Sequence, residues 1–143
     1  MAKMGGVVSA FPENDLNMNV AIASVLVAGL MPIVCAGIAK AGQKNYDNHN
    51  PREWLARQTG YRARANAAQG TCFEAFPFYA IGILVAMHAQ VPQERIDIYA
   101  GVFIAARVAY IACYVMDQHK LRSLAWFIGF LCTLGLYSAS LGA

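Results

Sequence analysis

The chain has 143 residues, of which 58% are apolar and 13% are charged, and a net charge of +3. This length suits one domain, and so apolar a composition excludes an ordinary soluble globular protein. The positive charge is not clustered on one helix, which argues against a nucleic-acid-binding protein.

Four apolar runs predict four membrane-spanning helices. The first and fourth runs carry no charged residue, the second carries only Glu74, and the third carries only Arg107. Each run reaches the roughly 20 residues, at about 1.5 Å rise per residue, that cross a hydrocarbon core about 30 Å thick. We therefore expect an all-α fold, an integral membrane four-helix bundle with up-down topology in a single domain. The expected spans are residues 17–40, 65–90, 97–116 and 122–141.

The segments outside these spans are polar. Residues 1–15 are expected to form an outer tail or a short cap. Residues 50–53, Asn-Pro-Arg-Glu, predict the start of a short interfacial helix over residues 51–58, with the Asn50 side chain as its cap. The loop over residues 92–97 is short, so we expect the second and third spans to be antiparallel neighbours.

The basic residues predict how the bundle is oriented. Because cytoplasmic loops carry an excess of lysine and arginine, the first and third loops are expected on the cytoplasmic side and both termini on the opposite side. Only Lys3 and Arg95 lie on that opposite side. The basic residues of the two cytoplasmic loops are Lys40, Lys44, Arg52, Arg57, Arg62, Arg64, Lys120 and Arg122.

Glu74 marks a polar stripe on the second span. A carboxylate near the middle of a bilayer costs at least about 2.5 kcal/mol on insertion scales. On a helix, spacings of three and four residues place the stripe on one side, which must then face protein or a wet cavity. The stripe consists of Asn66, Gln69, Gly70, Phe73, Glu74 and Pro77.

The third span carries the second charge within the apolar runs. Counted from the cytoplasmic ends of their helices, Arg107 and Glu74 both lie about 13 Å inside, so they are expected to pair. The sequence leaves two roles open for these residues: a buried ion pair that locks two helices together, or the binding of a ligand.

A row of polar side chains leads from Arg107 toward the cytoplasmic end. Tyr110 and Tyr114 follow it at i+3 and i+7, on the same helix face. Arg122 stands where the fourth span enters the membrane. The alternative to a binding role is an ordinary flanking cation for Arg122 and an interface anchor for Tyr114. Together these groups predict a positively biased pocket for an anionic, partly polar small molecule.

The four cysteines fall one in each apolar run, at Cys35, Cys72, Cys113 and Cys132. This placement favours small buried apolar residues over a disulfide framework, and a redox role for Cys72 is the alternative. Their spacing matches no metal site, so we expect no bound metal.

Several of these motifs together resemble the MAPEG superfamily, the membrane-associated proteins of eicosanoid and glutathione metabolism. The resemblance covers about residues 17–141 and suggests a bacterial-type member in the inner (plasma) membrane. It implies a homotrimer in membrane lipid that binds glutathione at the cytoplasmic side, while lipophilic small molecules reach the site from the bilayer. The motifs are Asn50-Pro-Arg, Arg62-Ala-Arg-Ala-Asn-Ala-Ala-Gln69, Glu74-Ala-Phe-Pro77, Arg107-Val-Ala-Tyr110-Ile-Ala-Cys-Tyr114 and Arg122-Ser123.

The resemblance also implies roles for individual residues. Glu74 would contact the glutathione amine, with Gln69 near the peptide backbone of glutathione. Arg107, Tyr110 and Tyr114 would hold its carboxylates and amide, and Arg122 would stabilise its thiolate. This set predicts a glutathione transferase or peroxidase that acts on lipophilic electrophiles.

Three positions depart from the family pattern. Members that bind glutathione usually have arginine where Ala67 stands, asparagine at Thr71 and often tyrosine at Ala75. Asn66 is a candidate binding residue, and it could replace a lost contact, as could Arg62 or Arg64. The alternative function is a non-catalytic membrane scaffold, a lipid- or quinone-binding protein or an accessory subunit of a larger membrane complex.

Overall fold

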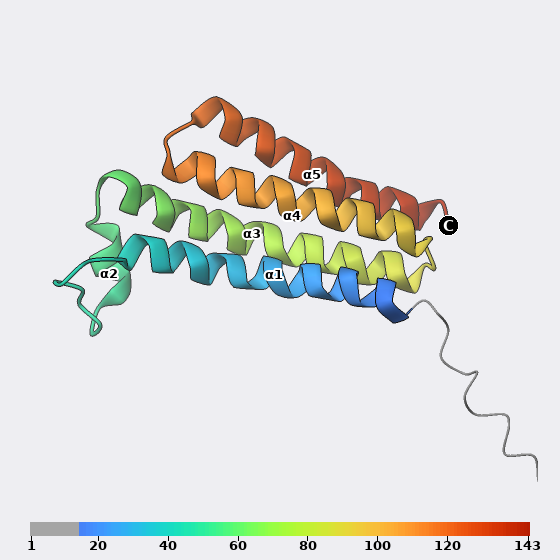
Figure 1. Ribbon diagram of the computed structural model, residues 1–143, viewed down its shortest axis with the longest axis horizontal. Coiled ribbons are helices and arrows are strands. Elements are labelled where there is room, and N and C mark those ends of the chain that lie inside the picture. Colours follow the sequence, from blue (N-terminus) through green and yellow to red (C-terminus); the bar gives the residue numbers. More distant parts are fainter. Residues whose placement is uncertain (1–14) are drawn as a thin grey trace, which may run out of the picture.

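The computed structural model describes residues 15–143 as a bundle of long helices (Figure 1). Four helices are long and apolar enough to span a membrane within this part of the chain, which confirms the predicted all-α four-helix membrane bundle. The predicted tail, residues 1–14, lies outside the described residues. The helices are α1 (Asp15–Lys40), α2 (Pro51–Ala56), α3 (Gly60–His88), α4 (Gln93–Val115) and α5 (His119–Leu141).

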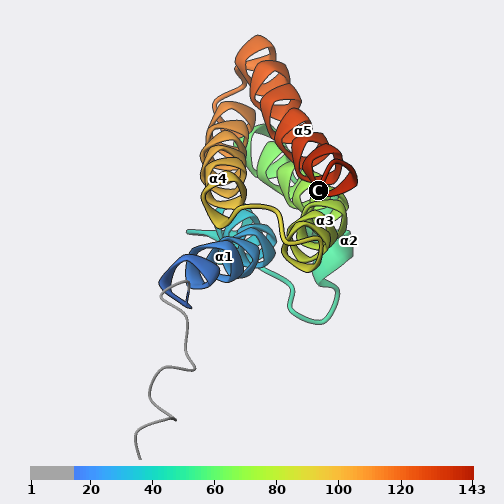
Figure 2. The same cartoon turned by 90° about the vertical axis from the view of Figure 1, so that its right-hand side faces the viewer.

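The long helices pack in an up-down arrangement with short connections. Helices α3 and α4 pack on each other, and each also packs on α1 and α5. Seen along the bundle, α1 and α5 lie at opposite edges (Figure 2). The second and third spans are therefore antiparallel neighbours.

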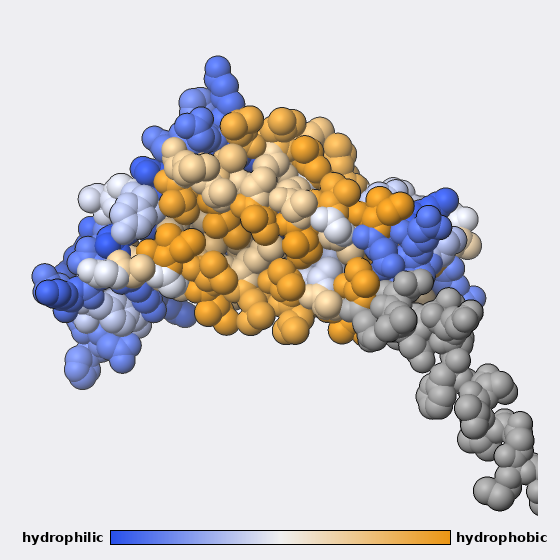
Figure 3. Space-filling view, viewed as in Figure 1, coloured by the Kyte–Doolittle hydropathy of each residue, from blue (hydrophilic) through white to orange (hydrophobic). Residues whose placement is uncertain are grey.

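The core of the bundle lies where α1, α3 and α4 meet. Small residues such as Ala21 and Ala28 let α1 approach α3 closely. The buried Tyr79 ring stacks on Phe103 with a centroid distance of 3.6 Å, and its hydroxyl shares a 2.7 Å hydrogen bond with Ser24. The face shown in Figure 3 is apolar between two hydrophilic ends, as a lipid-facing bundle requires.

The spanning helices extend beyond the apolar runs that predicted them. Helix α3 begins at Gly60, α4 at Gln93 and α5 at His119, each upstream of the expected span, which starts at residue 65, 97 and 122 respectively. In each case polar residues form the first turn or more of the helix. Hydropathy locates the membrane-buried part of a helix, whereas hydrogen bonding of the backbone continues into the polar flank.

The short helix α2 starts at Pro51 with Asn50 in the N-cap position, as predicted, and the Asn50 carbonyl accepts the first helical hydrogen bond from Trp54 N at 3.0 Å. The Asn50 side chain makes no capping hydrogen bond, because its backbone has ψ 64° instead of the extended conformation typical of an N-cap. The helix ends at Ala56, two residues before the predicted Gln58. Gly60, with φ +62°, then turns the chain into α3, a conformation that glycine adopts without steric cost.

Close packing of α4 on α5 depends on Gly135. A Cβ atom there would lie 2.5 Å from Cε1 of Tyr99, so Gly135→Ala is expected to destabilise the bundle by about 1–3 kcal/mol. Gly129→Ala is the matched control, because its Cβ would meet Phe103 at an ordinary 3.7 Å. Thermal unfolding in detergent measures both, and equal melting temperatures for the two variants would contradict the prediction.

Candidate functional site

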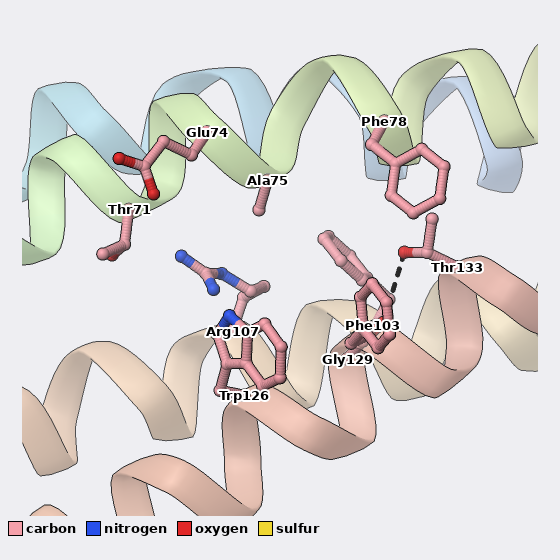
Figure 4. A pocket seen from close by; sticks show the side chains of 10 residues that line it. Thr71, Glu74, Ala75, Phe78, Phe103, Arg107, Trp126, Gly129 and Thr133 are labelled. Atoms are coloured by element: carbon pink, nitrogen blue, oxygen red, sulfur yellow. Dashed lines mark hydrogen bonds between the residues drawn. The ribbon is translucent and has the colours of Figure 1, made fainter.

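A cavity of about 210 Å³ lies between α3, α4 and α5 (Figure 4). Its two ends differ: Glu74, Thr71 and Arg107 gather at one end, and Phe78 and Phe103 lie toward the other. The cavity therefore joins a charged end to an apolar, largely aromatic one. The lining residues are Thr71, Glu74, Ala75, Phe78, Phe103, Arg107, Trp126, Gly129, Phe130 and Thr133.

Arg107 is buried although it carries a charge, with 3% of its surface exposed. Its Nη2 donates a hydrogen bond to Cys72 Sγ at 3.2 Å, and its guanidinium lies 4.4 Å from the centre of the Tyr110 ring. These two contacts turn the side chain along α4 and toward α3. They leave the charge of Arg107 without an acidic partner in the described part of the chain.

The predicted ion pair between Glu74 and Arg107 does not form. Among the side chains described, those of residues 20–143, the only salt bridge joins Glu53 of α2 to Arg57 directly after this helix. Glu74 and Arg107 nevertheless line the same cavity. Because Arg107 is held by Cys72 and Tyr110, both charged groups remain available to a third group in the cavity.

Four predicted site residues form one ladder of cations and aromatic rings along α4 and the start of α5. The rings of Tyr110 and Tyr114 meet edge to face with centroids 5.6 Å apart. Arg107 lies against the first ring, and the Arg122 guanidinium lies 4.4 Å from the centre of the second. Cations on aromatic faces are attracted by the ring quadrupole. The ladder thus holds two positive charges in one row, of which Arg107 lines the cavity and Arg122 does not.

The polar stripe of α3 is only partly covered within the chain. Asn66 and Gln69 are half-buried, whereas Gly70, Phe73, Glu74 and Pro77 are exposed. The stripe was expected to face protein or a wet cavity. Of its exposed residues, only Glu74 does so within the single chain, because it borders the cavity.

Arg62 and Arg64 have structural partners away from the cavity. Arg62 donates to the backbone carbonyls of Ala39 and Ala41, at 3.0 and 2.7 Å, and Arg64 donates to that of Val115 at 3.1 and 3.0 Å. Both arginines satisfy carbonyls at helix ends, where a cation also complements the helix dipole. Neither of them lines the cavity.

Sequence reasoning missed two features of the site: the aromatic side chains that line the cavity, and the hydrogen bond from Arg107 to Cys72. Trp126 and Phe130 on α5 stack on each other, with centroids 5.1 Å apart. They follow Arg122 at i+4 and i+8, a spacing that puts all three on one helix face and could have indicated the site. The contact between Arg107 and Cys72 joins residues 35 positions apart, and no local pattern announces it.

The chain was also compared with known proteins. The family model of the MAPEG family matches residues 20–142. No curated protein and no solved structure matches the chain. The family match covers all four helices that are long and apolar enough to span a membrane. The protein therefore belongs to the MAPEG family, the multi-pass membrane proteins of eicosanoid and glutathione metabolism.

Proposed function

We propose that the protein is a glutathione transferase or peroxidase that acts on lipophilic electrophiles. The observation that carries this proposal is the cavity shared by Glu74 and Arg107, with the ladder of Tyr110, Tyr114 and Arg122 beside it. Charge of both signs at one end and aromatic side chains at the other suit a ligand that is itself charged and a second, apolar reactant.

The residues present fit glutathione. The tripeptide has two carboxylates and one ammonium group, and the site offers two guanidinium groups and one carboxylate. Arg107 and the tyrosines would hold its carboxylates and amide, Glu74 its amine, and the amide side chains of Gln69 and Asn66 its peptide groups. Charge-assisted hydrogen bonds of this kind are worth about 1.5–3 kcal/mol each.

Glutathione, when bound, supplies the nucleophilic thiol. Arg122 would hold that thiol as the thiolate, because a cation within a few Å lowers the free energy of the charged form. The family's usual asparagine and tyrosine are replaced by Thr71 and Ala75, and the space beside Ala75 is part of the cavity. We assign that space, with Phe78, Phe103 and Trp126 around it, to the lipophilic substrate.

We also propose that the protein is a homotrimer. Glu74 is the central residue of α3 (Gly60–His88), yet it is exposed on the single chain. Exposure to lipid there would cost at least about 2.5 kcal/mol. A neighbouring copy packed on α3 would cover the stripe and complete the pocket.

The ends of the bundle suggest its orientation. The α1–α3 connection and the α4–α5 loop lie at one end of the bundle (Figure 1), and the basic residues of both predicted cytoplasmic loops lie in the α1–α3 connection or in the adjoining ends of α1, α3 and α5. We propose that this end is cytoplasmic, that the termini are not, and that the protein is a bacterial-type member in the plasma membrane.

Glutathione binding tests the function. Millimolar glutathione is expected to raise the melting temperature of the protein in detergent, as any ligand that binds only the folded state does. Glu74→Ala should remove most of this shift, because the glutathione amine loses its carboxylate. Glu94→Ala is the matched control, since Glu94 is exposed in the first turn of α4, outside the cavity. Absence of a shift in the unaltered protein would contradict the proposal.

One observation favours the alternative of a non-catalytic lipid-binding protein or accessory subunit. A second groove, of about 560 Å³ between α1 and α4, is lined only by apolar side chains such as Val34, Ile111 and Met116. An acyl chain or an apolar partner helix would suit it. No glutathione shift, together with co-purification of a large membrane partner, would support this alternative.

A further inference from the structure

Two cysteines meet where α1 packs on α3. Cys35 is fully buried and Cys72 is 3% exposed, and both belong to one cluster with Met31 and Ala68. The two side chains therefore pack in the same small cluster at the interface between α1 and α3. Small side chains such as Ala68 let the two helix backbones approach closely, which brings the two cysteines together.

Only one of the two thiols contacts a cation. Arg107 donates its hydrogen bond to Cys72 Sγ, and a thiolate is stabilised by such a charged donor. Cys132 offers a comparison, because it is equally enclosed but packs among the apolar side chains of the main core. Cys72 thus has the cationic donor that a reactive cysteine needs, although it is buried, and Cys35 stands where a resolving cysteine would stand.

A second, very small cavity reaches Cys72. Its volume is about 10 Å³, enough for about one water-sized molecule. It borders the main cavity, with which it shares Ala75, Phe103 and Arg107. A hydrogen peroxide molecule is close to this size, whereas a tripeptide or a lipid hydroperoxide is far larger.

We propose that Cys35 and Cys72 form a peroxide-sensing dithiol inside the bundle. The Cys72 thiolate attacks one oxygen of hydrogen peroxide, the O–O bond breaks, and Cys72 becomes a sulfenic acid while hydroxide takes up a proton and leaves as water. Cys35 then attacks the sulfenic sulfur, the S–S bond forms, and a second water leaves. Two equivalents of a reducing thiol restore both cysteines and become a disulfide themselves.

Peptide mapping of the full chain tests this proposal. The protein in detergent is treated with hydrogen peroxide, remaining thiols are alkylated, and the peptides are separated without reductant. A cross-linked peptide that joins Cys35 to Cys72 is expected, and reductant should remove it. Cys35→Ser should leave a sulfenic acid on Cys72 that dimedone traps, and Cys72→Ser should give neither product.

Two further variants separate selective chemistry from general oxidation. Arg107→Met is expected to slow formation of the cross-link by roughly tenfold or more, because a charge-assisted hydrogen bond to the sulfur is lost. Cys132→Ser, the matched buried cysteine, should leave the rate unchanged. A melting temperature for each variant shows that it is folded.

The result that would overturn the proposal is a Cys72 that stays fully alkylatable, on unfolding, after peroxide treatment of the folded protein. Oxidation of Cys113 and Cys132 at the same rate as Cys72 would overturn it as well, since the arginine contact would then confer no reactivity. The readout needs no glutathione, so it is independent of the proposed transferase function.

Discussion

Arg122→Ala is expected to lower turnover with glutathione and an aryl halide electrophile by roughly 100- to 1,000-fold, the effect of removing one group that stabilises developing charge. The side chain is half-buried at the start of α5 and lies on the face of Tyr114. Such a contact is worth about 0.5–1 kcal/mol, so folding and assembly should persist. The rate of product absorbance and size-exclusion chromatography measure the two effects separately.

The turnover of Arg122→Ala should also depend on pH differently from that of the unaltered protein. Without a neighbouring cation, the thiol of glutathione ionises near a pKa of about 8.5. The rate of the variant should therefore rise with pH up to about 8.5 and recover part of the loss, whereas the rate of the unaltered protein should already be level there. Lys120→Ala, an exposed cation two residues earlier, should behave as the unaltered protein does. If Arg122→Ala fails to assemble instead, Arg122 is structural.

The fold could be predicted because its main determinant is local. A run of about 20 apolar residues cannot cross a bilayer except as a helix, so counting such runs yields the bundle. The ends of the helices could not be predicted as well. Helix α3 starts at Gly60 because Arg62 and Arg64 find carbonyl partners on α1 and α4 at its first turns. Those partners are distant in the sequence.

The site could be predicted in part for a similar reason. The row of Arg107, Tyr110 and Tyr114 follows from helical spacing alone, and the structure joins Arg122 to it. The partner of Arg107 could not be predicted in this way. A pairing inferred from similar depth along two helices takes no account of the direction in which each side chain points around its helix axis. A carboxylate at the right depth was available, but a sulfur atom on the inner face of α3 was nearer to the guanidinium.

Arg107→Met is expected to separate stability from binding. Arg107 is buried and has no acidic partner among the described side chains of residues 20–143, and an apolar side chain of similar length removes the desolvation cost of its charge. The melting temperature without ligand should therefore stay equal or rise. Glutathione affinity should fall by roughly 100-fold, which is about 2.7 kcal/mol, because a buried cation that contacts a carboxylate is lost.

Opposite signs for the two effects distinguish a functional charge from a structural one. Isothermal titration measures the affinity, and thermal unfolding without glutathione measures the stability. Arg107→Lys is the informative control, since it keeps the charge but loses the planar fork that donates to Cys72 and lies on Tyr110. Its affinity for glutathione should lie between that of the unaltered protein and that of Arg107→Met. A large drop in stability for Arg107→Met would show that the cation holds α3 and α4 together, and that its place in the bundle reflects packing and not a ligand.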